Sequence, residues 1–457
     1  MADLVSLPTQ EIERSAIRKI MLSLAPFLAL LYVFNMLDRG NVSSAALTMQ
    51  KDLHFSDTVY GLGAGIFFIG YFFFEVPSNL VMERVGARRW IARIMISWGI
   101  ISACMMFVRN PASFYGLRTL LGVAEAGFFP GIILYLTYWV PSKYRAQVIA
   151  RFLALTAIIG LVGPLISGQL LRMNGIGGLA GWQWLFLLEG MPSILLGFVV
   201  LGILPDRPSQ AGWLTPEEKS WIESSLVEDA QNTQRVQHLS WRVALTEPRI
   251  RMLCLIFIVT SVGGNAIGFF GPQLIKSRSG GLWPDWLVVT ALVIPDIVGA
   301  AAMALAAGHS DRTGRRRRHV TLGYFLAGLS FVACVFAPNA GWTIAALAFH
   351  KLGERTAAGS YWALTTNLLG VRAAAGGIAL INSVGNLGGF FGPLLMGKLK
   401  DSTHGGYTVG LYTAAGFMVL GSILAYFARN HPSSNPVQSA YVEGPTAIAS
   451  QTEQQVP

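Results

Sequence analysis

The sequence is short of charge and of cysteine. Only 13% of its 457 residues are Asp, Glu, Lys or Arg, about half of the roughly 25% that soluble domains carry. The three cysteines lie far apart inside apolar runs, so we expect neither a disulfide framework nor a metal site from them. These shortages, with 53% apolar residues, exclude the disordered and disulfide-rich secreted classes and leave a polytopic membrane protein.

The sequence also lacks the motifs of an enzyme. It contains no His-x-x-x-His, no Cys-x-x-Cys and no phosphate-binding loop. We therefore expect no catalytic residue, no metal and no cofactor. The net charge of +10 does not predict nucleic-acid binding, because the basic residues sit between apolar segments and not on one basic face.

Long apolar runs predict twelve membrane-spanning helices, since one span needs about 20 mostly apolar residues. They are expected at 20–44, 57–82, 90–108, 112–139, 146–171, 183–204, 252–275, 286–307, 319–337, 342–367, 374–397 and 407–428. The first run is too long for the core of a signal peptide, so we expect it to stay as the first span. The predicted fold is an all-α bundle of twelve spans.

Most of the 34 Lys and Arg residues fall on the side that holds both termini, which predicts cytoplasmic termini. The expected segments are a cytoplasmic tail (1–19), a six-helix bundle (20–204), a cytoplasmic middle segment (205–248), a second six-helix bundle (249–428) and a disordered cytoplasmic tail (429–457). Within the middle segment, Thr215, Pro216 and Glu218 predict the capped start of a surface helix.

The two halves resemble each other. Residues 82–90 read MERVGARRW and residues 310–318 read SDRTGRRRR. Residues 160–168 read GLVGPLISG and residues 389–397 read GFFGPLLMG, at almost the same interval. Two unrelated motifs repeated at one interval indicate duplication of a six-span unit, which is a transporter architecture.

The repeated acid-Arg-x-Gly loops with following arginines resemble the signature of the major facilitator superfamily. More narrowly, the chain resembles the anion:cation symporter family, including bacterial tartrate and other organic-acid permeases. The stretches that carry this are FNMLDRGNVSSAAL (34–47), GYFFFEVPSNLVMERVGARRWIARIMISWG (70–99), GVAEAGFFPG (122–131), WQWLFLLEG (182–190) and GGIALINSVGNLGGFFGP (376–393). The resemblance implies a bacterial inner-membrane location and a monomer.

Charges near the bilayer centre cost about 2.5–3.5 kcal/mol each and need a reason. Asp38 and Arg39 end the apolar part of the first span, and Arg118 shares a face of the fourth span with Glu125. They form either structural ion pairs or a proton- and anion-binding site. In the second interpretation Arg39 binds a substrate carboxylate and loosens its hold on Asp38, while Arg118 pairs with ionised Glu125. The family resemblance implies these same roles.

A second cluster lies in the tenth span. Lys351 and His350 can each pair with Glu354 on one helix face. The cluster is either self-neutralising or an accessory part of the site. Asp296, in the eighth span after Pro295, is a further acid of open role.

Polar residues on other spans complete the candidate substrate site. Asn382 and Asn386 share a helix face and either bind substrate or join helices. Trp362 either packs or lines the site, and the resemblance favours a binding role for Tyr71. The full set of expected substrate-binding residues is Arg39, Tyr71, Gln273, Trp362, Asn382 and Asn386.

The repeated loops predict gates at the cytoplasmic helix ends. Acid–arginine pairs between neighbouring helices would hold the outward-open state and break on inward opening; anchoring by basic residues alone is the alternative. The expected gating residues are Glu83, Arg84, Arg88, Asp311, Arg312 and Arg315.

These features predict a proton-coupled symporter of a small organic anion, a tartrate-like hydroxycarboxylate or sugar acid, working by alternating access. Its expected partners are that anion, protons and the lipid bilayer. An organic-anion uniporter or exchanger without proton coupling, or a permease for aromatic acids such as phthalate or 4-hydroxyphenylacetate, would use the same architecture. A non-transporting sensor is disfavoured, because the middle segment is too short for an output domain.

Overall fold

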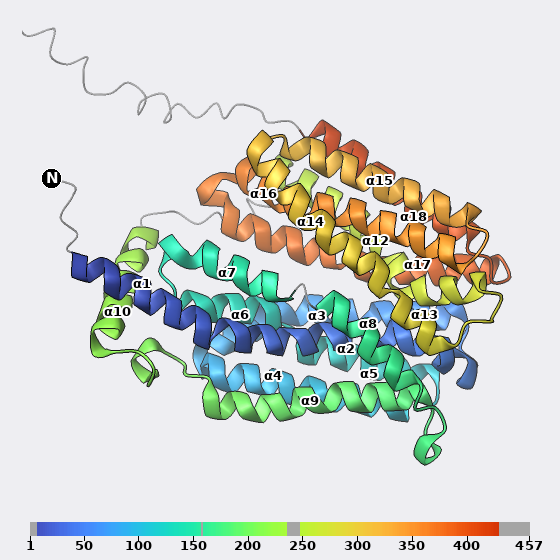
Figure 1. Ribbon diagram of the computed structural model, residues 1–457, viewed down its shortest axis with the longest axis horizontal. Coiled ribbons are helices and arrows are strands. Elements are labelled where there is room, and N and C mark those ends of the chain that lie inside the picture. The colour runs from blue at the N-terminus through green and yellow to red at the C-terminus, as the bar shows by residue number, and fades with distance from the viewer. Residues whose placement is uncertain (1–6, 157–158, 235–246, 429–457) are drawn as a thin grey trace, which may run out of the picture.

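The computed structural model describes residues 7–156, 159–234 and 247–428, and within these residues it contains helices and no strand. Figure 1 shows the helices running side by side along the long axis of the molecule. The first half of the chain contains α1 (Leu7–Ser23), α2 (Ala25–Asp52), α3 (Asp57–Val85), α4 (Ala87–Cys104), η1 (Met105–Phe107), α5 (Pro111–Glu125), α6 (Phe128–Thr137), α7 (Ser142–Thr156), α8 (Ile159–Leu171), η2 (Ile176–Gly178) and α9 (Gly181–Ile203).

The middle segment and second half are helical as well. They contain η3 (Pro208–Gln210), α10 (Pro216–Gln234), α12 (Pro248–Arg278), α13 (Asp285–Ala291), α14 (Val293–Thr313), α15 (Arg316–Phe336), α16 (Ala340–Asn386), α17 (Gly388–Ser402) and α18 (Thr408–Phe427). The expected disordered tail, 429–457, lies outside the described residues.

The helices follow the predicted spans. Nine helical segments of the described chain are long and apolar enough to cross a membrane. The fifth predicted span falls on α7 and α8, and the tenth and eleventh fall on α16 and α17. The all-helical prediction is therefore confirmed, while several predicted spans consist of two helices and α16 extends across the predicted loop between the tenth and eleventh.

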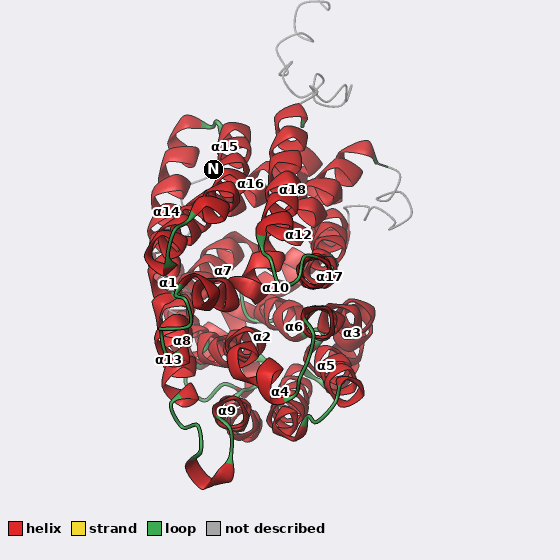
Figure 2. Cartoon of the chain, turned by 90° about the vertical axis from the view of Figure 1, so that its right-hand side faces the viewer, coloured by secondary structure: helices red, strands yellow, loops and turns green. Residues whose placement is uncertain are grey.

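Two groups of helices face each other. In Figure 1 the blue-to-green helices α2 to α9 form the lower group, and the yellow-to-red helices α12 to α18 form the upper group. The end view in Figure 2 shows the same two groups. Contacts between them run mainly along α3 with α17, α8 with α13, and α2 with α12. A site between the groups is thus walled by helices from both halves.

The end of the molecule that carries α1 and α10, called here the terminal end, is held by ion pairs. Lys19 Nζ lies 2.9 Å from Glu218 Oε2, and Ser15 donates to the other oxygen of that carboxylate. The predicted capping box is confirmed, because Thr215 and Glu218 exchange hydrogen bonds at the start of α10. The expected tail, 1–19, overlaps α1, which begins at Leu7 and continues to Ser23.

The opposite end, called the distal end, is closed by contacts between the halves. Asp401 at the end of α17 accepts hydrogen bonds from the backbone N–H groups of Asp57 (3.1 Å) and Thr58 (2.8 Å), which open α3. The neighbouring Lys400 Nζ lies 2.8 Å from Asp57 Oδ1. A helix N-terminus favours an anion, so α17 supplies a cap to α3 from the other half of the chain.

Removing this distal cap should let the two halves separate there. A chain carrying both Lys400→Met and Asp401→Ala loses the ion pair and the cap; a cap is worth about 1 kcal/mol, or roughly a fivefold shift in an equilibrium. Spin labels are attached at Lys51→Cys and Ser402→Cys in a background without the native cysteines. Double electron–electron resonance should then report a longer distance between the two labels in the double variant than in the protein that keeps Lys400 and Asp401. Lys398→Met, at an exposed lysine of the same helix, is the matched control. Identical distance distributions in the double variant and the control would show that these contacts do not close the end.

Candidate functional site

An ion pair between α2 and α5 lies at the centre of the first half. Arg39 Nε donates to Glu125 Oε1, and Glu125 is fully buried while the Arg39 side chain is 26% exposed. The Arg39 guanidinium also lies over the rings of Tyr71 (4.6 Å) and Phe67 (5.4 Å). Arg39 is therefore held from two sides and accessible from a third, as an anion-binding group must be.

A break in the fourth span places Glu125 at a helix end. Helix α5 stops at Glu125, and α6 starts after Gly127, whose φ of 83° lies in the left-handed region. A Cβ at Gly127 would lie 2.7 Å from the Cβ of Ser78, so glycine is needed there for both conformation and space. The second oxygen of Glu125 has no hydrogen-bond partner within the described residues.

Within the described residues no hydrogen bond or ion pair joins Asp38 to Arg39, which differs from the predicted pairing. Its carboxylate points to the other side of α2 and accepts hydrogen bonds from Trp98 (2.6 Å) and Ser102 (2.7 Å) on α4. Asn41 (3.2 Å) and Ser193 (3.3 Å) are its remaining donors. All of these donors are neutral, so a substrate bound at Arg39 does not compete with Asp38 directly.

In this conformation Arg118 is held by backbone carbonyls, and among the described residues no hydrogen bond or ion pair joins it to Glu125, which differs from the predicted pairing. It is 1% exposed and donates to the carbonyl oxygens of Gly63 (3.1 Å) and Ala64 (3.0 Å) of α3. Its guanidinium also lies 4.9 Å from the centre of the Phe67 ring. In this conformation Arg118 joins α5 to α3 and leaves Glu125 to Arg39.

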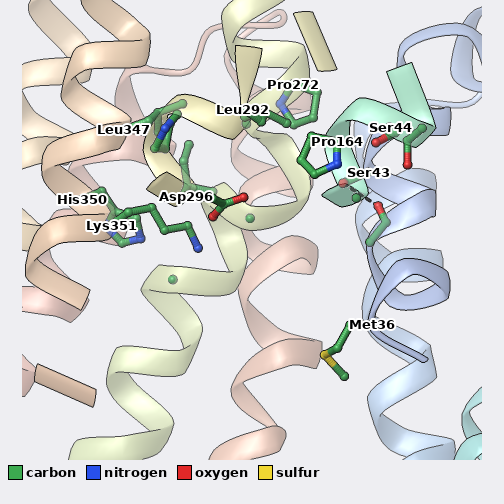
Figure 3. A pocket seen from close by; sticks show the side chains of 18 of the residues that line it. Met36, Ser43, Ser44, Pro164, Pro272, Leu292, Asp296, Leu347, His350 and Lys351 are labelled. Carbon is green, nitrogen blue, oxygen red and sulfur yellow. Dashed lines mark hydrogen bonds between the residues drawn. The ribbon is translucent and has the colours of Figure 1, made fainter. Parts of the chain in front are cut away.

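A cavity of about 240 Å³ lies between the halves, beside α2. Figure 3 shows Ser43 and Ser44 on α2 facing Asp296 and Lys351, which come from α14 and α16. Ser167 of α8 lines it too. The cavity is small and mostly apolar, with polar groups from both halves, which suits a small polar molecule.

The cluster on α16 pairs as predicted. Lys351 Nζ lies 3.1 Å from Glu354 Oε2, and His350 Nε2 lies 3.8 Å from the same atom. The His350 ring also stacks on Phe331, with the ring centres 4.4 Å apart. Lys351 therefore faces the cavity while a carboxylate on its own helix already balances its charge.

The other predicted substrate residues lie in different surroundings. Gln273 is 8% exposed, and within the described chain neither of its amide atoms has a partner. Trp362 packs edge-on against Phe257, with the ring centres 5.4 Å apart. Asn382 and Asn386 are half-buried on α16.

One contact between this part of α16 and the first half was not predicted from the sequence. Ser383 lies between them and donates to Glu75 Oε2 of α3 at 3.2 Å. Glu75 is 6% exposed. No spacing in the sequence marks a lone serine for this role, because its partner is on the opposite half of the chain.

The predicted gating residues lie at the terminal end and are not paired as expected. Arg88 contacts Asp206 of its own half, with 3.8 Å between Arg88 Nε and Asp206 Oδ2. Glu83 and Arg84 are exposed, as are Arg312 and Arg315. The side chain of Asp311 lies outside the described residues. The described ion pair of the predicted gate thus lies within one half, whereas Asp401 and Lys400 join the two halves at the distal end.

The described residues contain no group of three or more His, Cys, Asp or Glu side chains placed to hold a metal ion. The apolar helices, the two facing halves and the charged groups between them define a polytopic membrane transporter and not an enzyme. The chain belongs to the major facilitator superfamily, whose family model matches residues 28–393 and again 286–451.

Relatives and solved structures agree with this family. Two proteins of Agrobacterium vitis named "Putative tartrate transporter" are 46% identical over 433 residues, which is 94% of this chain and 95% or 99% of theirs. A "Quinolone resistance transporter" of Acinetobacter baumannii is 36% identical and covers 95% of this chain and 100% of its own length.

Two solved transporters share the fold. A bacterial homologue of the human lysosomal transporter Spinster, in an inward-facing and occupied conformation, superposes with a TM-score of 0.73 at 16% identity, covering 88% of this chain and 96% of its own. The xylose transporter XylE of Escherichia coli gives 0.70 at 14% identity, covering 89% and 97%.

The helix break at Gly127 should be intolerant of a side chain. Gly127→Ala places a Cβ against Ser78 and holds alanine in the left-handed region, which costs about 1–2 kcal/mol. We expect a lower melting temperature for the purified protein and weaker function, since Glu125 is two residues away. Gly116→Ala on α5, where a Cβ would meet no atom within 4 Å, should leave the melting temperature unchanged or raise it. Equal melting temperatures for the Gly127 variant and the wild type would contradict this account of the break.

Proposed function

We propose that this transporter carries a small organic carboxylate, of the tartrate-like hydroxycarboxylate or sugar-acid class, together with protons. The observation that supports this most directly is the Arg39–Glu125 pair, in which a partly exposed guanidinium is held by a fully buried carboxylate. The names of the two 46%-identical relatives support the cargo class.

The pair suggests how proton and anion are coupled. In the resting site the charge of Arg39 is balanced by Glu125. When a substrate carboxylate binds the Arg39 guanidinium in place of Glu125, Glu125 is left without a cationic partner in a site that excludes water. An unpaired buried carboxylate is costly, so Glu125 takes up a proton. The loaded site then holds a cation, an anion and a neutral acid, which restores the balance.

The cavity supplies further contacts for such a cargo. Ser43 and Ser44 offer hydroxyl groups to the substrate, and Lys351 offers a second cation. We assign Tyr71, which lies under the Arg39 guanidinium, to holding that group in place. Gln273, Trp362, Asn382 and Asn386 are assigned to the substrate path from the other half.

Transport would follow from exposing this site to each side in turn. The distal contacts of Asp401 close one side, and the predicted gating residues close the other when the halves rock. The basic residues of the terminal end favour the cytoplasm for that end, and for both chain termini. In this proposal the protein works as a monomer in the bacterial inner membrane.

The test of the proposed function is uptake of radiolabelled L-tartrate into proteoliposomes, with and without an inward proton gradient. We expect accumulation above the outside concentration only with the gradient. Uptake that merely equilibrates would indicate a uniporter or exchanger. Inhibition by phthalate or 4-hydroxyphenylacetate, and not by sugar acids, would indicate an aromatic-acid permease.

Substitution of Arg39 should impair binding even when charge is kept. Arg39→Lys loses the forked geometry, and hydrogen bonds to a charged group are worth about 1.5–3 kcal/mol, so we expect tartrate affinity to fall by roughly tenfold or more. Arg109→Lys, at an exposed arginine, is the control and should bind as the wild type does. Equal affinity in Arg39→Lys would remove Arg39 from the substrate site.

Substitution of Glu125 should separate transport from the gradient. Glu125→Gln imitates the protonated acid, so tartrate exchange across the membrane should continue while gradient-driven accumulation is lost. The measurement compares counterflow with gradient-driven uptake in the same vesicles. Accumulation at the wild-type level would exclude Glu125 from coupling.

A further inference from the structure

Two buried carboxyl groups of the first half lie on helices that pack against each other, α2 and α9. Asp38 on α2 is 0% exposed and Glu189 on α9 is 2% exposed. Ser193, which follows Glu189 by one helical turn on α9, donates to Asp38 at 3.3 Å. Nothing in the coupling of Glu125 to Arg39 uses this pair.

Neither carboxyl has a cationic partner in the described part of the chain. The donors to Asp38 are the side chains of Trp98, Ser102, Asn41 and Ser193. Glu189 Oε1 accepts from Ser167 at 2.6 Å, and its Oε2 has no hydrogen-bond partner within the described residues.

The charged residues that interact electrostatically with Asp38 and Glu189 do not neutralise the two carboxyl groups. Glu125 acts on Asp38 with the same sign of charge, and Asp38 acts likewise on Glu189. Arg118 is the cation that interacts with Asp38 electrostatically, but its hydrogen bonds go to Gly63 and Ala64. Helix α4 contributes only neutral donors here, and α8 contributes Ser167.

Electrostatics then limits the charge that this pair can hold. Two carboxylates that share one buried site repel each other, so both cannot be ionised without a cation. Asp38 has four donors to stabilise a negative charge, whereas Glu189 has a bare oxygen. An un-ionised acid explains that bare oxygen better than a carboxylate does, because it leaves less charge unsolvated.

We propose that Glu189 is a further proton-holding group of the first half, and that Ser167 connects it to the cavity. This rests on the proposed function, because it gives proton-coupled transport a store separate from Glu125. Ser167 lines the cavity and already donates to Glu189. A hydronium ion in the cavity gives a proton to Ser167 Oγ as the serine hydroxyl proton moves to Glu189 Oε1, so the serine stays neutral.

The site can be tested without any substrate. Infrared spectra of the purified protein, taken in light and heavy water at neutral pH, report the carbonyl stretch of protonated carboxyl groups. The wild type minus Glu189→Gln spectrum should contain such a band, and Glu189→Asp should keep it at a shifted frequency. Glu217→Gln, at a fully exposed acid of α10, should leave the band unchanged. If Glu189→Gln keeps every protonated-carboxyl band of the wild type, Glu189 holds no proton and the proposal fails.

Transport assays then distinguish a proton-holding role of Glu189 from a purely structural role. In proteoliposomes, Glu189→Gln should exchange tartrate within about twofold of the wild type, while the number of protons moved per tartrate falls by one. Ser167→Ala should keep the infrared band and slow proton-driven uptake more than exchange. An unchanged proton-to-tartrate ratio in Glu189→Gln would overturn the proposal. If tartrate is not carried at all, the infrared band still decides it, and only the cargo assignment is lost.

Discussion

The cost of a charge without a partner in a low-dielectric interior controls this structure. Four of the charged residues in the apolar interior of the first half are stabilised in three different ways. Arg39 and Glu125 neutralise each other, Arg118 is solvated by backbone carbonyls, and Asp38 is solvated by neutral side chains. Of these arrangements, an incoming anion can replace a partner only in the Arg39–Glu125 pair, because there a partly exposed cation has a partner that can be exchanged.

The rest of the fold serves to place that pair between two halves. Gly127 breaks the fourth span so that Glu125 stands at a helix end, facing Arg39 on α2. The cavity between the halves, which Gly40 next to Arg39 helps to line, takes its walls from both halves, so its access depends on how they meet. At the distal end they meet through the cap that Asp401 provides for α3, whereas at the terminal end the described gating residue Arg88 pairs with Asp206 of its own half.

Sequence reasoning reached the fold and the important residue types. Span length, basic-residue asymmetry and the repeated loops depend on composition along the chain, so the helices were predictable, and Arg39 and Glu125 stood out as charges in apolar runs. Their partners were not predictable. The pairing of Arg39 with Glu125, and of Asp38 with Trp98, depends on the rotation of each helix about its axis, which the sequence does not determine. Asp401 was missed because an acid after an apolar helix looks like any solvated helix end, and its partner is in the other half.

The central claim is that a substrate anion and a proton replace the Arg39–Glu125 pair together. The most direct test is proton uptake when L-tartrate is added to the purified protein in weakly buffered solution, compared between wild type and Glu125→Gln. The account predicts that the wild type takes up protons on binding and that Glu125→Gln takes up fewer, by one per tartrate bound. Equal proton uptake in the two proteins would contradict it.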